Sequence, residues 1–438
     1  MKRFSIIALA VAAVMLFAIP AMAADLSFSG HYRARGYYND NTDLDDDTGA
    51  TNSWMDMRFR LKTKIKVNDR LSVITRFDAL DNKSWGNTDN PQDNAGDDNI
   101  DWDRAYIKAK FDYFDLQLGR MGAGTWGTKF LNSAREADRI RIIKKIKPYT
   151  IRFTYEKKVE DDKDTADSDN DEDRYMADIA YKAKGINTGL FLGYYRDMDD
   201  SDIGANAYAR KYWFVGPYIK GTYGPVKYEA ELGCKNGDYK DMYAAGAQDV
   251  DYDAWAYHVN LATDLGPTTV SLGYAHTDGN DANDAGEYNA YGLGGNDWQP
   301  LLILTGFYSD RKLGDAGNIN SYNGKLKSKP VGAATQVDTE VLGYDLYYAT
   351  LSFSPMENVT LNAIIGTAKA DETSTLGNNV DDEYGVEYDV GCKIKLMDNL
   401  VYQIKAGFLS AGDLWKSTTG KNEVDDTYSF FHELKVTF

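Results

Sequence analysis

The sequence predicts a transmembrane, up-and-down antiparallel β-barrel of about eighteen strands. Apolar and polar side chains alternate with a period of two along most of the chain, as they do on strands, where neighbouring side chains point to opposite faces. Short turns alternate with long acidic connections, an arrangement typical of barrels that cross a membrane. Beyond residue 23 no apolar run approaches the roughly 18 residues that a transmembrane helix needs.

Residues 1–23 have the pattern of a cleaved signal peptide. The positive pair Lys2-Arg3 precedes an apolar run over residues 4–19, and Ala21-Met22-Ala23 places small residues at the cleavage positions. The alternative is an N-terminal membrane anchor, which the small-residue motif disfavours. The segment is therefore left out of the predicted fold, and the protein is expected to be exported.

The composition taken alone describes a soluble acidic protein. The 438 residues include 67 acidic and 49 basic side chains, which gives a formal net charge of −18. This sign of charge excludes the basic nucleic-acid-binding class. The chain has 2 Cys and 4 His and contains no Cys-x-x-Cys-His motif, so it cannot attach haem covalently by itself.

The alternation is clearest over residues 54–67, where Phe59 and Leu61 fall on one face and Arg58 and Arg60 on the other. An even number of such strands, with both chain ends at the short-turn side, closes a barrel without an exposed edge. We assign residues 24–438 to this barrel. Sixteen strands is the alternative count, because the long connection 278–339 is difficult to parse. The expected strands lie near 25–38, 54–67, 70–80, 100–111, 114–121, 138–147, 149–159, 173–184, 187–197, 207–220, 225–235, 251–264, 267–277, 340–354, 358–370, 382–397, 399–411 and 425–438.

A secreted β-sandwich or β-helix can also have alternating apolar and polar residues. The last predicted strand distinguishes a membrane barrel from these folds. It ends on Phe438, with Val436, Leu434 and Phe430 apolar at alternate positions. With this strand, and with Leu118-Gly119-Arg120 at the end of the fifth strand, the sequence resembles the Gram-negative outer-membrane porins. General porins have sixteen strands, and substrate-selective ones often have eighteen.

The resemblance implies a location and a set of partners. The protein is expected in the outer membrane of a Gram-negative bacterium, in contact with lipid and lipopolysaccharide. The long acidic loops would face outward and the short turns the periplasm. The barrel-assembly machinery would recognise the strand that ends on Phe438, and the protein would form a homotrimer.

The polar faces of the first four strands predict a basic patch inside the channel. Guanidinium groups stay charged at any physiological pH, so such a patch is a permanent source of positive field. The alternative is that these cations only pair with interior acids such as Asp56 and Asp78. The patch consists of Arg33, Arg35, Arg58, Arg60, Arg76 and Arg104, and Lys62 extends it toward the periplasm.

Residues 121–137 are expected to form a constriction loop. Gly122, Gly124 and Gly127 permit the tight path that an inward loop needs. By resemblance to porins, the loop would narrow the channel opposite the basic wall and set up a transverse field across it. The alternative is an ordinary surface loop. The further channel-lining residues expected here are Arg120, Glu136 and Asp138.

No dedicated metal site or cofactor is predicted. The fourth long loop carries acids at alternate positions, which suits loosely bound calcium or a bridge to lipopolysaccharide phosphates. The loop lacks the sixth-position Gly and twelfth-position Glu of an EF-hand. The weak candidate ligands are Asp167, Asp169, Asp171 and Asp173.

The predicted function is passive diffusion of small hydrophilic solutes, with a weak preference for anions. An enzyme is not expected, because no Ser–His pair with a third orienting group is placed by the sequence. Two alternatives stay open: the barrel sheath of a porin–cytochrome electron conduit and a substrate-specific channel. The connection 278–339 contains the apolar stretch Leu301–Thr305. It can plug the lumen, contact a neighbouring subunit or form another hairpin.

Overall fold

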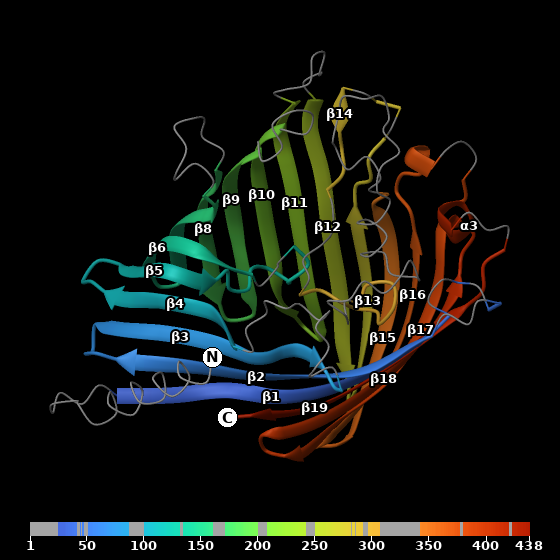
Figure 1. Cartoon of the computed structure of the whole chain (residues 1–438), viewed down its shortest axis with the longest axis horizontal. Helices are drawn as coiled ribbons and strands as arrows, with labels where there is room; N and C mark the ends of the chain where they lie inside the picture. Colours follow the sequence, from blue (N-terminus) through green and yellow to red (C-terminus); the bar gives the residue numbers. More distant parts are fainter. Residues whose placement is uncertain are drawn as a thin grey trace.

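The computed structural model has a single closed wall of eighteen antiparallel strands. In Figure 1 this wall runs from β1 round to β19, which lies beside β1. A nineteenth strand, β14, has two residues and lies outside this wall. The structure describes residues 25–41, 44, 46–47, 51–86, 100–131, 135–160, 171–199, 208–241, 250–281, 283–284, 286–291, 297–306, 342–376, 380–419 and 423–438. The predicted signal peptide, residues 1–23, lies outside these ranges, and its cleavage stays a prediction.

The wall strands match the eighteen predicted segments within four residues at each end, except that β11 continues six residues beyond its predicted end. Their bounds are β1 (Asp25–Asp40), β2 (Asn52–Lys66), β3 (Leu71–Ser84), β4 (Ile100–Lys110), β5 (Asp115–Gly122), β6 (Glu136–Ile146), β7 (Tyr149–Val159), β8 (Glu172–Ala183), β9 (Ile186–Asp199), β10 (Tyr208–Tyr223), β11 (Val226–Asp241), β12 (Val250–Leu265), β13 (Thr268–Thr277), β15 (Tyr344–Met356), β16 (Val359–Lys369), β17 (Glu383–Met397), β18 (Leu400–Ala411) and β19 (Thr427–Thr437).

The barrel closes where the first strand meets the last. β1 pairs with β19 over ten residues, from His31 opposite Thr437 to Asp40 opposite Tyr428. The terminal Phe438 extends this seam, because its amide donates to the Gly30 carbonyl at 3.1 Å and its carbonyl accepts from the Gly30 amide at 2.8 Å. Closure leaves no strand edge unpaired. The predicted eighteen-stranded barrel is confirmed.

The connection after β13 adds no strand to the wall within the described residues. β13 pairs directly with β15, from Thr268 opposite Phe353 to Thr277 opposite Tyr344. The short β14 (Glu287–Tyr288) pairs parallel with β12 at the long-loop end of the barrel. The count of sixteen strands is therefore wrong.

The burial pattern is inverted relative to a water-soluble protein. Large apolar side chains such as Trp213, Leu272 and Val390 face outward and are 58–64% exposed. Charged side chains such as Asp78 and Glu156 face inward and are 1% exposed. Charged residues are almost never fully buried in soluble proteins unless they are paired. An apolar outer surface with a polar interior places lipid outside and the lumen inside.

Within the described connections at the long-loop end lie two short helical turns. The 3₁₀ turn η1 covers Ser374–Leu376, and α3 covers Leu414–Thr419. Trp415 of α3 is fully buried, and its indole N–H donates to the Tyr384 carbonyl at 2.7 Å. In the ranges given above, no helix is long and apolar enough to cross a membrane.

Candidate functional site

The segment that follows β5 turns into the barrel and contacts strands on another part of the wall. We call residues 123–131 the inward loop. The Trp126 indole N–H donates to the Gly216 carbonyl of β10 at 3.2 Å. The Thr128 amide and hydroxyl both donate to Glu231 of β11, at 2.7 and 2.6 Å. These contacts span β5 to β11, so the loop narrows the open cross-section of the lumen.

Glycine at position 127 is required by this path. Gly127 has φ +54°, a left-handed conformation that favours glycine. A Cβ placed there would lie 2.5 Å from the Glu231 carboxyl carbon. The backbone can therefore approach the buried Glu231 only because residue 127 has no side chain. Lys220 of β10 donates to the Gly127 carbonyl at 2.6 Å and holds the turn from the other side.

A second segment, residues 297–306, also lies inside the barrel, and we call it the lumen segment. Leu301 to Leu304 are all buried. The Leu302 amide donates to Asp389 at 2.9 Å, and the Ile303 and Leu304 amides donate to the two oxygens of Glu387 at 2.6 and 2.7 Å. Three consecutive backbone amides of the lumen segment thus donate hydrogen bonds to two carboxyl groups of β17 that point into the barrel.

Aromatic rings join the inward loop to the lumen segment. Phe130 of the loop meets Trp298 of the segment edge-on, with ring centroids 4.9 Å apart. Both rings pack on His258 of β12, which is fully buried and lies 2.9 Å from the Tyr348 hydroxyl. The two segments therefore form one continuous obstruction across part of the lumen.

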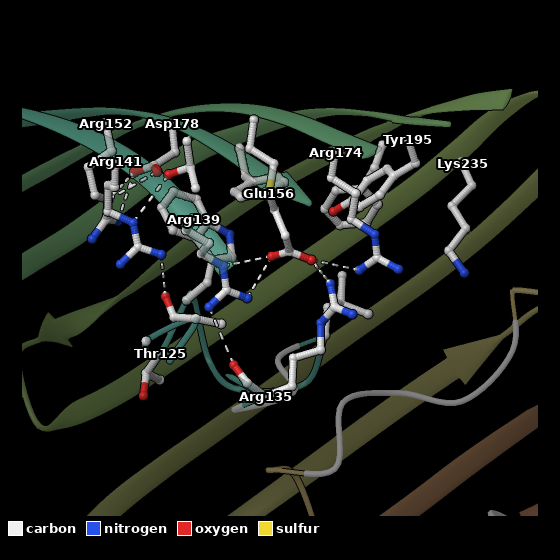
Figure 2. Close-up of a pocket in the computed structure, with 18 of the residues that line it drawn as sticks. Thr125, Arg135, Arg139, Arg141, Arg152, Glu156, Arg174, Asp178, Tyr195 and Lys235 are labelled. Atoms are coloured by element: carbon white, nitrogen blue, oxygen red, sulfur yellow. Dashed lines mark hydrogen bonds and ion pairs between the residues drawn. The ribbon is translucent and has the colours of Figure 1, made fainter. Parts of the chain in front are cut away.

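Beside this obstruction lies a cavity of about 340 Å³. Its walls are the inward loop and the inner faces of β6 to β11 (Figure 2). Six basic and two acidic side chains line it, so cationic groups outnumber carboxylates by four. The basic residues are Arg135, Arg139, Arg141, Arg152, Arg174 and Lys235, and the acidic ones are Glu156 and Asp178.

Figure 2 shows three arginines converging on Glu156. This carboxylate is 1% exposed and pairs with Arg139 at 2.6 Å, with Arg174 at 3.5 Å and with Arg135. Arg174 also pairs with Glu172, so two carboxylates face these three arginines. A buried carboxylate is stable when it is paired in this way, and the surplus positive charge stays in the cavity.

Two of the cationic groups have no carboxylate partner among the residues that the structure describes. Arg141 donates only to neutral acceptors, the Thr154 hydroxyl at 3.2 Å and the Ala123 carbonyl at 3.1 Å. Lys235 donates to the Tyr291 carbonyl, and its ammonium lies 4.1 Å from the Tyr291 ring centroid. Burial raises the pKa of the Tyr291 hydroxyl well above its usual value, so this neighbour stays neutral and does not offset Lys235.

The predicted basic patch on β1 to β4 is brought together, but it lies in a network of carboxylates. Arg35 makes two hydrogen bonds of 2.7 Å to Asp56. Arg33 donates to the Asn82 side chain at 2.6 Å and has no ion pair within the described ranges. Lys62 is exposed. The other pairs join Arg58 to Asp78 and Asp81, Arg60 to Asp78 and Asp103, Arg76 to Asp103 and Glu136, and Arg104 to Glu136.

This network nearly balances the predicted patch. Five of the six arginines pair with five carboxylates, so little net charge is left for the lumen there. Glu136 does not stand across the channel from the arginines. Its carboxylate lies 2.5 Å from Arg76 and 2.7 Å from Arg104. Glu136 therefore forms direct ion pairs with arginines of the patch, and the predicted transverse field between them across the channel does not arise.

Arg120 and Asp138 lie on the outer face of the wall rather than in the lumen. They are paired residues of β5 and β6, two positions from the exposed Leu118 and Ile140 on the same face. Their side chains are 50% and 62% exposed and 3.6 Å apart. Residues two apart on a strand lie on the same face. The sequence-based assignment of Arg120 and Asp138 to the lumen did not apply this rule.

The acidic connection after β7 is described only at its end. Asp171 pairs with Lys157, and Asp173 accepts from the Tyr155 hydroxyl at 2.8 Å and lies 3.6 Å from Arg196. Protein cations therefore neutralise these two candidate calcium ligands. Asp167 and Asp169 lie outside the described residues.

A family model described as Gram-negative porin matches residues 8–296 of the chain. The chain belongs to this family of porins. Porins are outer-membrane channels and not enzymes, so the resemblance, the location and the absence of catalysis predicted from the sequence are confirmed. No curated protein matches the sequence.

Solved structures of Pseudomonas aeruginosa channels share the fold of this porin. OccK8 (OprE) has 11% sequence identity and a TM-score of 0.55, and the match covers 94% of this chain and 98% of that one. OccK9 (OpdG) has 13% identity and a TM-score of 0.54, with 94% and 99% covered. OpdK with vanillate has 13% identity and a TM-score of 0.50, with 94% and 98% covered. At these identities the likeness concerns the fold alone.

The sequence contained a signal for the cationic cavity that the prediction did not use. Arg139 and Arg141 on β6, Arg152 on β7 and Arg174 on β8 all occupy inward positions of their strands. The alternation that assigned the patch on the first four strands would have assigned these four as well. Lys235 follows the same alternation, because it shares the inner face of β11 with Glu231. Arg135 had no such signal, because it precedes β6 and does not lie in a strand.

Proposed function

We propose that this porin is a passive diffusion channel for small hydrophilic solutes that prefers anions, and that the cationic cavity sets this preference. The observation that carries the proposal is the surplus of basic over acidic groups around the cavity. Low-dielectric walls lined by one sign of charge concentrate counter-ions. Arg141 contributes to this field without a described carboxylate to offset it, since its hydrogen bonds go to neutral acceptors.

The cavity also fits an organic anion. Phe191, Tyr212 and Phe214 line it together with the arginines. Guanidinium groups bind carboxylates through paired hydrogen bonds, while the rings offer an apolar surface. A substrate-specific channel is therefore the second candidate, and the aromatic rings beside the arginines favour it. OpdK was solved with vanillate, an aromatic carboxylate, and vanillate is the probe of choice for this porin.

The electron-conduit interpretation has less support. A sheath must leave its lumen open for a partner protein, whereas the inward loop and the lumen segment both cross this lumen. We further propose, from the family alone, a homotrimer and recognition of the Phe438 strand by the barrel-assembly machinery. The mass of the detergent-solubilised protein, measured by light scattering, tests the trimer.

The wild-type porin is expected to be anion-selective in planar bilayers. Under a tenfold KCl gradient, the reversal potential should take the sign of chloride permeation, because the cavity concentrates chloride over potassium. The preference should weaken as salt rises, since the Debye length falls from about 10 Å at 0.1 M to about 3 Å at 1 M. Cation selectivity at low salt would contradict the proposal. Saturable block of the current by vanillate would favour the substrate-specific candidate.

Replacement of Glu136 by Gln is expected to increase the anion preference by about twofold in permeability ratio. Glu136 pairs with Arg76 and Arg104, so its neutralisation exposes two guanidinium charges to the lumen. The matched control is Asp138→Asn, which removes the same charge two residues away on the outer face. The control should leave the reversal potential unchanged. An equal shift in both variants would show that the effect does not arise in the lumen.

A further inference from the structure

Three potential metal ligands gather at the long-loop end of the barrel, well away from the cationic cavity. One donor atom each of His276, Asp345 and Asp371 lies within 4.8 Å of the others. The residues come from three elements: His276 is near the end of β13, Asp345 is near the start of β15, and Asp371 follows β16.

The cluster lies on the outer face of the wall. His276 is on the same face of β13 as Tyr274 and the exposed Leu272, and Asp345 is two residues from the exposed Tyr347 of β15. Asp345 and His276 are paired residues of adjacent strands. The site therefore faces the headgroup level of the membrane and not the solute path.

The orientation of the imidazole is that of a metal ligand with its supporting carboxylate. His276 Nε2 lies 2.8 Å from Asp278, and Nδ1 lies 3.0 Å from Asp345. Histidines that bind metals usually donate the N–H of the other ring nitrogen to a carboxylate, which fixes the ring. Here Asp278 lies beside Nε2, and Nδ1 lies on the other side of the ring beside Asp345, which also accepts a hydrogen bond from the Tyr274 hydroxyl at 2.5 Å.

The cluster also carries unbalanced negative charge. Asp278, Asp345 and Asp371 have no Lys or Arg within 4.0 Å in the described part of the chain; their only cationic neighbour is the His276 imidazole. The nearest lysine in the pairing register, Lys369, makes its ion pairs with Asp382 and Glu383 instead. A dication would offset this charge, whereas a protonated His276 offsets only one of the three.

We propose that His276, Asp345 and Asp371 bind a divalent transition-metal ion of the zinc class, with Asp278 as the orienting group. Imidazole nitrogen together with carboxylate oxygens suits zinc better than magnesium or calcium, which prefer oxygen ligands alone. Bonds of about 2.0–2.1 Å place the ligands of a tetrahedral zinc ion about 3.3 Å apart, so modest side-chain rotations close the site. The ion ties β13, β15 and the segment after β16 together.

Isothermal titration of the full-length, chelator-stripped porin in detergent with ZnCl₂ tests the site. One saturable site per chain is expected, and millimolar CaCl₂ should not abolish it. His276→Gln should weaken binding by about tenfold or more. The control His432→Gln removes another outer-face histidine, which packs on the rings of Tyr402 and Phe430, and it should bind zinc as the wild type does.

Asp371→Asn is the second variant, because Asp371 lies outside the strands and its replacement leaves the wall intact. It should also weaken zinc binding, and zinc should raise the thermal unfolding temperature of the wild type more than that of either variant. Binding that is absent in the wild type, or that is unchanged in both variants, would overturn the proposal. In the first case the cluster is a protonated histidine held by its carboxylates.

Discussion

Replacement of Glu387 by Gln is expected to raise the single-channel conductance at least about twofold by releasing the lumen segment. Glu387 is fully buried and accepts from the Ile303 and Leu304 amides. A glutamine oxygen can accept one of these bonds, but its NH₂ group then faces the other N–H. An unsatisfied buried donor costs about 1–3 kcal/mol, and a difference of about 1.4 kcal/mol changes the ratio of docked to released segment tenfold.

Planar-bilayer recording checks this expectation through the appearance of a larger conductance level. The matched control is Glu433→Gln, which neutralises an inward carboxylate of β19 that accepts from Gln403 at 3.3 Å. The control makes the same substitution at another lumen carboxyl group and leaves the lumen segment bound. If Glu387→Gln and Glu433→Gln give the same conductance, charge and not the segment limits the current.

The double variant Arg141→Gln, Lys235→Gln is expected to weaken the anion preference of the channel. These groups have no described carboxylate partner. Their replacement therefore takes two basic groups from the cavity without depriving a described carboxylate of its partner. Removal of Arg139 is a poorer test, because it would leave the buried Glu156 with less compensation. The reversal potential under a KCl gradient should move toward zero, and block by vanillate should weaken.

Arg120→Gln is the control for this second prediction. Arg120 carries the same charge but lies on the outer face, paired with Asp138. Its replacement should change neither the reversal potential nor the block by vanillate. An unchanged selectivity in the double variant would show that any anion preference arises in another part of the lumen, such as the network around Arg76 and Arg104.

The candidate site shows where prediction from the sequence succeeds and where it ends. The inward positions of Arg35 and Arg76 follow from alternation, and the structure places both inside the wall. Asp56 was named as a possible partner in the alternative interpretation, but Asp103 and Glu136 were not, because they come from other strands whose relative register is decided by sheet pairing. The patch was therefore expected to be basic, whereas ion pairs nearly balance it.

The two segments inside the lumen depended still more on tertiary structure. The prediction left three interpretations of the stretch Leu301–Thr305 open, because an apolar run in a loop has no periodicity to orient it. The structure buries it against Glu387 and Asp389, which lie more than eighty residues away in the chain. The contact between Thr128 and Glu231 spans a similar distance in sequence.

The sequence by itself determined that this chain is a membrane barrel of about eighteen strands, because the strand period is local: each side chain's face follows from its neighbours two residues away. The structure decided between eighteen strands and sixteen. The terminal Phe438 and the alternation of short turns with long loops are likewise properties of consecutive residues. The charge of the solute path was decided only by tertiary structure. Whether an arginine inside a barrel is a free cation or half of an ion pair depends on which strand, loop or plug contacts it inside the lumen. A local sequence pattern does not specify that contact.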